Sequence, residues 1–86
     1  MHPPAASASV LRVEGVVLRV DTINRELVVF AGGARVVVDV PAGCRIVLRG
    51  EPVRLRMLQP FDRIQAACTA SGGLPVAHSI EVQPGR

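Results

Sequence analysis

The sequence predicts an all-β fold, a small barrel of five or six short strands with one short helical turn near residues 53–58. Three observations lead to this. β-Branched residues recur in short runs bounded by Gly, Pro, Asn and Asp, and no stretch keeps the 3.6-residue period of a helix. The 86 residues are enough for one hydrophobic core and too few for two.

The first strand is expected over residues 10–21. Leu11 and Val13 occupy alternate positions, as in a strand with one buried face. Beyond Gly15 the alternation loses its phase, because Val17 and Val20 do not fall on one face. A glycine at such a slip predicts a bulge or a sharp bend in the strand.

A hairpin is expected across Gly32-Gly33, because glycine readily adopts the positive φ angles of a tight turn. The turn joins residues 25–31 to residues 34–40. Apolar residues alternate with others in both strands, which sets the register if one face is buried. The expected core positions are Leu27, Val29, Ala31, Val36, Val38 and Val40.

Residues 44–48 are expected to form another short strand. Leu55 and Leu58 lie between two prolines and are three residues apart, which predicts one helical or 3₁₀ turn over the barrel. A second hairpin is expected to join residues 62–71 to 74–83 across Gly72-Gly73. Its first strand places three residues on one face: Ile64, Ala66 and Cys68.

These segments carry a Gly-x-Val strand followed by Val-Asp, a Leu-x-Pro-x-Asp-x-Ile turn and a closing Ala-x-x-Ile-x-Val strand. In that order, over about residues 12–83, the chain resembles a bacterial domain family of uncharacterised function with a small OB-like β-barrel. The matching residues are Gly15, Val17, Val20, Asp21, Leu58, Pro60, Asp62, Ile64, Ala77, Ile80 and Val82. The chain departs from the family at Phe61, where glycine is more usual. The resemblance implies an OB-like barrel and supplies no activity.

We expect one domain over residues 10–83, a flexible lead-in over residues 1–9 and a short tail at residues 84–86. The lead-in is rich in Pro, Ala and Ser and lacks the basic and apolar regions of a secretory signal. No apolar run approaches the roughly 20 residues that cross a bilayer. These features predict a cytoplasmic protein without a membrane partner, although a chain whose leader had been removed would look the same.

Apolar residues outnumber the positions that one barrel core can take. The residues expected opposite the core are Val16, Leu18, Val28, Phe30, Val37 and Val47. Such a face predicts self-association into a closed or filamentous homo-oligomer, and the leading hypothesis is a non-catalytic structural or assembly module. The alternative is a register shift at the bulges, which would turn several of these valines inward.

The net charge of +3 comes with ten arginines and no lysine. The densest basic cluster comprises Arg45, Arg49, Arg54 and Arg56. It supports a second hypothesis, the binding of nucleic acid or another polyanion. Phe30 and Phe61 are the only aromatic residues, so this binding is expected to be weak and independent of base sequence.

No metal, cofactor or enzymatic activity is expected. Cys44 and Cys68 are interpreted as small buried hydrophobic residues. His78 is expected roughly opposite Cys68 in the second hairpin, but two soft ligands do not make a zinc site. The aspartates Asp21, Asp39 and Asp62 fall at turns or on polar strand faces, where turn capping or solubility explains them.

Overall fold

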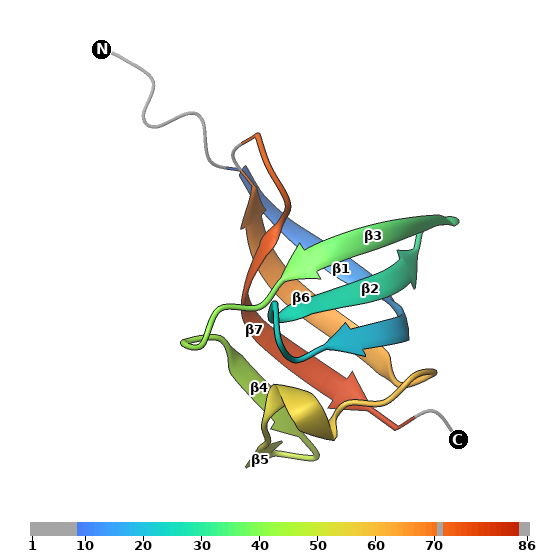
Figure 1. The fold of residues 1–86 in the computed structure, drawn as a ribbon, viewed down its shortest axis with the longest axis vertical. Helices are drawn as coiled ribbons and strands as arrows, with labels where there is room; N and C mark the ends of the chain where they lie inside the picture. Colours follow the sequence, from blue (N-terminus) through green and yellow to red (C-terminus); the bar gives the residue numbers. More distant parts are fainter. Residues whose placement is uncertain (1–8, 71, 85–86) are drawn as a thin grey trace.

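The computed structural model describes residues 9–70 and 72–84 (Figure 1). The expected lead-in therefore lies outside the described residues except for Ser9. Within the described residues the elements are β1 (Ser9–Asp21), β2 (Glu26–Ala31), β3 (Ala34–Asp39), β4 (Arg45–Leu48), β5 (Glu51–Pro52), the 3₁₀ helix η1 (Leu55–Met57), β6 (Arg63–Ala70) and β7 (Val76–Gln83).

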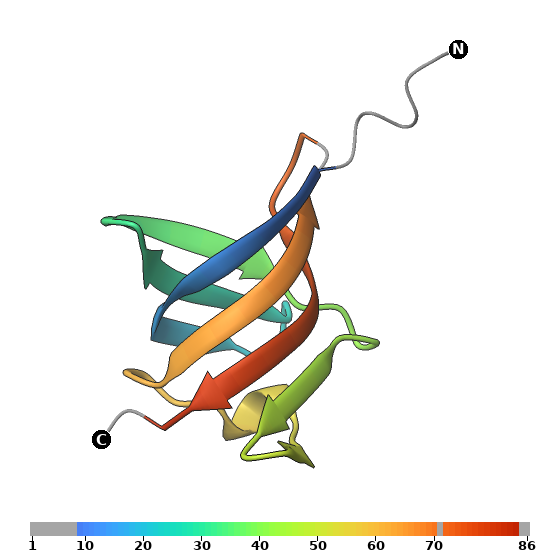
Figure 2. The same ribbon diagram turned by 180° about the vertical axis from the view of Figure 1, so that it is seen from behind.

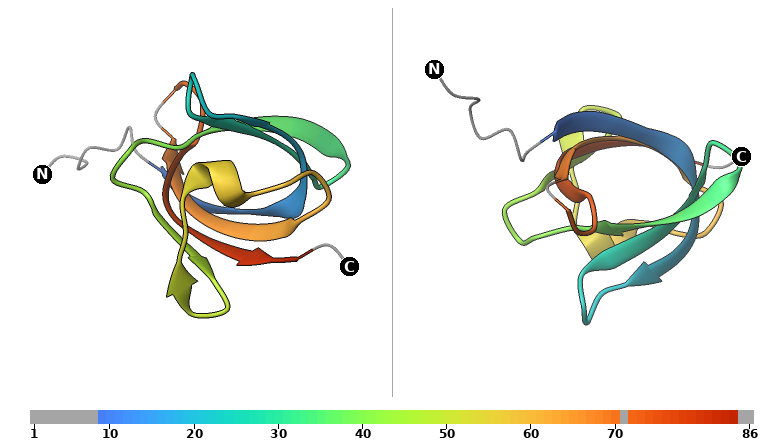
Figure 3. Two further views of the ribbon diagram at one scale, coloured as in Figure 1. Left: turned by 60° about the horizontal axis from the view of Figure 1, so that its bottom comes forward. Right: turned by 90° about the horizontal axis from the view of Figure 1, so that it is seen from above.

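A ring of five strands closes the barrel, in the order β1, β2, β3, β7 and β6. Four of the five junctions are antiparallel, and the fifth is a short parallel contact between β3 and β7 at Asp39 and Val76. The Asp39 N–H donates to the Pro75 carbonyl at 2.8 Å and strengthens that contact. The end views in Figure 3 show the ring, with η1 lying over one opening. The predicted all-β barrel and helical turn are confirmed.

β4 extends the sheet outside the ring. It runs parallel to β7, with Arg45 beside Ser79 and Leu48 beside Val82, and the two-residue β5 pairs with it. Figure 2 shows β4 next to β7, on the side of β7 opposite β6. This arrangement makes β7 a central strand with a neighbour on each side.

β1 turns the corner of the barrel. Its first half pairs with β6 and its second half with β2, and Val16 is shared by both pairings. A Cβ atom at Gly15 would collide with the Phe30 carbonyl oxygen, so only glycine lets β2 pass this closely. The bend predicted at Gly15 is confirmed, and the register shift follows between Val17 and Arg19.

The core consists mainly of alternate residues from the ring strands, together with Ile46 of β4 and Leu55 of η1. Four of the six core positions expected in the first hairpin are buried, whereas Ala31 and Val36 are half-buried and pack against the core. Gly32 and Gly33 have φ angles of 60° and 83°, and the hairpin pairs Ala31 with Ala34. The largest fully enclosed side chains are Val17, Leu27, Val29, Val38, Val40, Cys68 and Ile80. Leu55 and Leu58 are also buried and close one end of the barrel.

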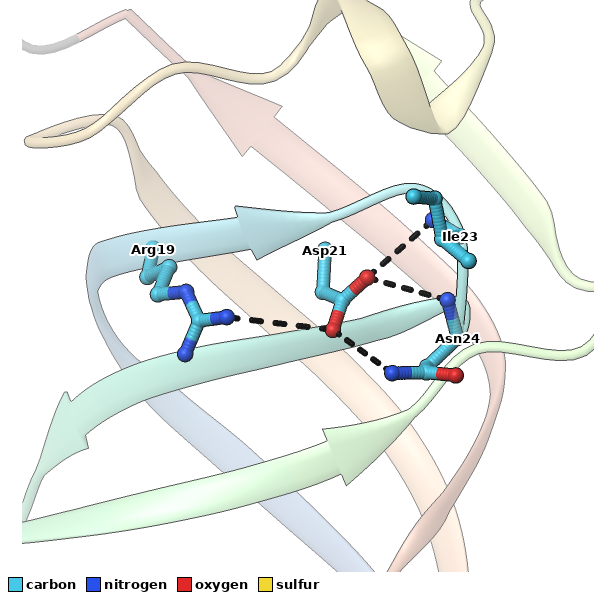
Figure 4. Close-up of polar contacts among 4 residues, drawn as sticks. All are labelled: Arg19, Asp21, Ile23 and Asn24. Atoms are coloured by element: carbon cyan, nitrogen blue, oxygen red, sulfur yellow. Dashed lines mark hydrogen bonds and ion pairs between the residues drawn. The ribbon is translucent and has the colours of Figure 1, made fainter.

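Asp21 ends β1 and organises the following turn (Figure 4). Its carboxylate accepts hydrogen bonds from the Ile23 N–H at 3.1 Å, the Asn24 N–H at 2.9 Å and the Asn24 side-chain amide at 3.0 Å. Arg19 forms a long ion pair with the same carboxylate at 3.9 Å. The hydrogen bonds from the Asn24 backbone and side chain lower the pKa of Asp21.

The turn before β6 is held by reciprocal bonds. The Gln59 N–H donates to the Asp62 carboxylate at 2.9 Å, and the Asp62 N–H donates to the Gln59 carbonyl at 3.1 Å. The Phe61 N–H donates to the Val17 carbonyl at 2.7 Å, which joins the turn to β1. Phe61 takes a φ of 77°, in the left-handed region that favours glycine. The residue that departs from the resembled pattern is therefore strained.

Candidate functional site

Two cysteines lie on opposite sides of β7. Cys68 on β6 is paired with Ala77 of β7, and Cys44 immediately precedes β4, whose Arg45 pairs with Ser79 of β7. Cys68 is only 1% exposed and belongs to the core. Cys44 is half-buried and packs against that core. The expectation of small buried cysteines holds fully for Cys68 and only in part for Cys44.

The surroundings of each thiol raise its pKa. Burial and, to a smaller extent, the charge of a Cys68 thiolate raise the pKa of Cys44 to about 11, and the Arg25 guanidinium partly opposes them. Burial also raises the pKa of Cys68. Both thiols are therefore neutral at pH 7 in the metal-free protein. The Cys44 Sγ contacts the Arg45 carbonyl at 3.8 Å.

A cleft of about 400 Å³ opens beside Cys44. It lies between the β1–β2 turn, the connection from β3 to β4, and the segment leading into η1. The cleft is lined by Thr22, Arg25, Ala42, Cys44, Ile46, Val53, Arg54, Leu55 and Arg56. These described residues include three guanidinium groups and no carboxylate. Cys44 is thus reached through a cleft whose charge is positive.

Arg25 is fixed in the wall of this cleft. Its Nε donates to the Val40 carbonyl at 2.8 Å and its Nη2 to the Pro41 carbonyl at 3.4 Å. Arg54 and Arg56 are exposed, and neither guanidinium group forms an ion pair or a hydrogen bond with another residue in the described ranges. The cleft therefore holds one anchored guanidinium and two that are available to a ligand.

The structure divides the four arginines that the sequence groups together. Arg54 and Arg56 line the cleft, whereas Arg45 lies on the outer side of the sheet and lines a different hollow with Arg12. Arg49 occupies the turn between β4 and β5, with a φ of 54°. Sequence reasoning missed Arg25, because nothing in its local sequence indicates that it lines the same cleft as Arg54 and Arg56.

The apolar residues predicted opposite the core do lie outside it. Val16 pairs with Phe30 and Val28 with Val37 across β1, β2 and β3, and Leu18 occupies the β1 register shift. Leu18 is 36% exposed and Phe30 is 47% exposed, and the valines are half-buried. Val47 is separate, on β4 beside Glu81. A register shift that turns these valines into the core is therefore not present. Self-association through these residues stays a prediction.

His78 does not join the thiols. Its register is near Cys68, as expected, but His78 lies at the irregularity in the β6–β7 pairing and is exposed, whereas Cys68 faces the core. Its Nε2 shares a 2.7 Å hydrogen bond with the Thr69 hydroxyl. Across residues 9–70 and 72–84, no three or more His, Cys, Asp and Glu side chains form a cluster able to hold a metal.

Within the described part of the chain, no helix has both the length and the apolar character needed to span a bilayer. The cytoplasmic location expected from the sequence stays a prediction.

Comparison with known proteins finds likeness only at the level of structure. No protein-family model and no curated protein sequence matches this chain. Two solved structures match, both of CusF. The silver(I) form superposes with a TM-score of 0.70 over 87% of this chain and 99% of that one, at 12% identity. The apo form, residues 6–88 from Escherichia coli, superposes with a TM-score of 0.73 over 96% of this chain and 98% of that one, also at 12% identity.

These matches contradict the function expected from the sequence. The matched protein is one whose structure holds silver(I), which supports neither a self-associating assembly module nor a binder of nucleic acid or other polyanions. The small bacterial barrel implied by the resemblance agrees with them at the level of architecture. At 12% identity the likeness establishes the fold alone, and the chain has the β-barrel fold of CusF.

Proposed function

We propose that this protein binds a soft monovalent metal ion, silver(I) or copper(I), as cargo held by the thiolates of Cys44 and Cys68. The observation that carries the proposal is the pair of thiols on either side of β7, of which Cys68 belongs to the hydrophobic core and Cys44 packs against the same core. The fold shared with the silver(I) form of CusF supports it.

The donor set fits this class of ion. Thiolates are soft ligands and favour soft ions such as copper(I) over hard divalent ions. A structural zinc site takes four ligands, and the described residues offer no cluster of three or more His, Cys, Asp and Glu. Monovalent d¹⁰ ions are satisfied by two sulfur ligands. The earlier expectation of no metal considered zinc, for which two ligands are too few.

Metal binding must displace the thiol protons. Because burial raises the pKa of both thiols, each is protonated at pH 7 and must become a thiolate to coordinate. Two protons are released for each bound ion. The apparent affinity is therefore expected to rise by up to about 100-fold per pH unit below the thiol pKa values.

The proposal is tested by titrating the reduced protein with silver(I), and with copper(I) against a coloured chelator, and by counting bound ions in native mass spectra. We expect one ion per chain. Cys44→Ser and Cys68→Ala should each lower the affinity by more than about 100-fold, the upper range for losing a group that merely supports a ligand.

Two variants serve as controls, since they remove soft donors outside the proposed pair. His78→Ala and Met57→Leu alter exposed side chains and should leave the affinity unchanged. Circular dichroism checks that each variant folds. If the Cys44→Ser/Cys68→Ala double variant folds and keeps the original affinity and stoichiometry, the proposal is wrong.

A further inference from the structure

We infer that the cleft beside Cys44 receives the ion as a small anionic complex with sulfur ligands, rather than as the hydrated cation. This inference rests on the proposed function and names the form of the substrate. Bis(thiosulfato)argentate(I) is a convenient representative, because it carries silver(I) between two anionic sulfur ligands.

The charge around Cys44 is the first reason. Arg25, Arg54 and Arg56 line the cleft together, and its described lining contains no carboxylate. Asp21, which lies next to the lining residue Thr22, is occupied by the turn N–H groups and by Arg19. A free cation approaching Cys44 is repelled by this wall, whereas an anion is attracted and concentrated near it.

The hydrogen-bonding capacity of the cleft is the second reason. The guanidinium groups of Arg54 and Arg56 have no partner among the described residues, so their N–H donors remain available for the oxygens of a bound anion. Arg25 is held by the carbonyls of Val40 and Pro41 and keeps a positive charge close to Cys44. Anion binding at this site therefore breaks no existing ion pair.

The size of the cleft is the third reason. Its volume of about 400 Å³ lies within the range of small-ligand sites. Ile46, Val53 and Leu55 provide an apolar lining that suits polarisable sulfur ligands. A small complex can reach Cys44 there, and Cys68 is buried on the other side of β7.

The transfer is a ligand exchange that conserves charge and oxidation state. The Cys44 thiol gives its proton to water, Sγ bonds to silver(I), and the bond between silver and one thiosulfate sulfur breaks. That thiosulfate leaves with its electron pair. Cys68 displaces the second thiosulfate in the same manner, and silver remains monovalent throughout.

The test is stopped-flow measurement of silver(I) uptake from an anionic donor, bis(thiosulfato)argentate(I), and from a cationic donor, bis(pyridine)silver(I). The double variant Arg54→Gln/Arg56→Gln is compared with Arg35→Gln/Arg45→Gln. The control pair loses the same charge at exposed arginines outside the cleft lining. Final occupancy is read from native mass spectra.

At low salt we expect the cleft variant to take silver from the anionic donor at least about tenfold more slowly than the control variant, with a weaker salt dependence. Uptake from the cationic donor should be equal or faster, and final occupancy should stay at one ion. Equal slowing in both arginine variants, or equal slowing with both donors, overturns the inference while leaving the proposed function intact. No uptake from either donor by the unaltered protein overturns both.

Discussion

Arg25 and Val40 bind each other in both directions. The Val40 N–H donates to the Arg25 carbonyl at 2.9 Å, and the Arg25 Nε donates to the Val40 carbonyl at 2.8 Å. The turn between β1 and β2 is thereby tied to the chain leaving β3, fifteen residues later. This link builds one wall of the cleft and places a positive charge near Cys44.

Replacing Arg25 with lysine should weaken the fold although the charge is kept. The flexible ammonium group cannot reproduce the Nε and Nη2 bonds to Val40 and Pro41. We expect a loss of about 1–2 kcal/mol in the free energy of unfolding, measured by urea denaturation. Arg35→Lys, at an exposed site on β3, should change it by less than about 0.5 kcal/mol. Equal effects of both substitutions would contradict this account of Arg25.

Gly15→Ala should destabilise the barrel strongly. The new Cβ would collide with the Phe30 carbonyl oxygen and lie 2.9 Å from a Val29 methyl carbon, so β2 must move away from β1. We expect a loss of about 3 kcal/mol or more, or a failure to fold, seen in the thermal transition. Gly43→Ala is the control, because a Cβ there meets nothing within 4 Å. A native-like transition in Gly15→Ala would refute the close approach.

Phe61 offers a test of backbone strain. Its φ of 77° favours glycine, and its ring is 69% exposed, so little packing is lost on truncation. Phe61→Gly should be more stable than Phe61→Ala by about 1 kcal/mol, because only glycine adopts this conformation freely. Urea denaturation of both variants measures the difference. If alanine proves the more stable replacement, the left-handed conformation is not present in solution.

The stability of the metal-free protein should fall in alkaline solution. The pKa of Cys44 is about 11 in the folded chain, above the ordinary thiol value of about 8.5. The folded state therefore favours the neutral thiol, and its contribution is complete below pH of about 8.5 and lost as the pH rises toward 11.

The composition of the chain limits the number of side chains that titrate in this pH range. The chain contains no lysine and no tyrosine, so the thiols are the only side chains whose ordinary pKa values fall within that window. Urea denaturation between pH 7 and pH 11 should show the decline, and Cys44→Ser should reduce it. A decline of the same size in Cys44→Ser would assign the effect to another group.

Mild oxidation should not join Cys44 to Cys68 within one chain. The residues lie on either side of β7, and two strand spacings separate backbones by about 10 Å. A disulfide needs Cα atoms closer than about 7 Å. After diamide treatment, mass spectrometry of the monomer should show both thiols still free to react. A loss of two hydrogens with an internal crosslink would place the cysteines closer than the structure does.

Local backbone chemistry explains which elements could be predicted. Gly32-Gly33 supplies the positive φ angles of the first hairpin, and Leu55 and Leu58 between two prolines indicate the single helical turn. Alternating valines give the core face, because neighbouring side chains of a strand point in opposite directions. Each of these signals acts between residues close together in the chain.

The candidate site has no such signal. Cys44 and Cys68 lie on either side of β7, and Arg25 lines one cleft with Arg54 and Arg56 only in the folded barrel. The sequence suggested instead a linear cluster from Arg45 to Arg56, which the barrel divides between different surfaces. Spacing along the chain is a poor guide here, because barrel curvature determines which side chains face each other.

By itself, the sequence determined that this chain is an all-β protein, with most of its core residues, a two-glycine hairpin and a bend at Gly15. Those properties follow from side-chain alternation and from the φ preferences of single residues. Only the tertiary structure decided that β3 meets β7, that the two thiols flank β7 and that three arginines line one cleft. These contacts join distant segments, and they arise because a strongly bent β1 pairs with both β6 and β2 and brings the sheet round to close on itself.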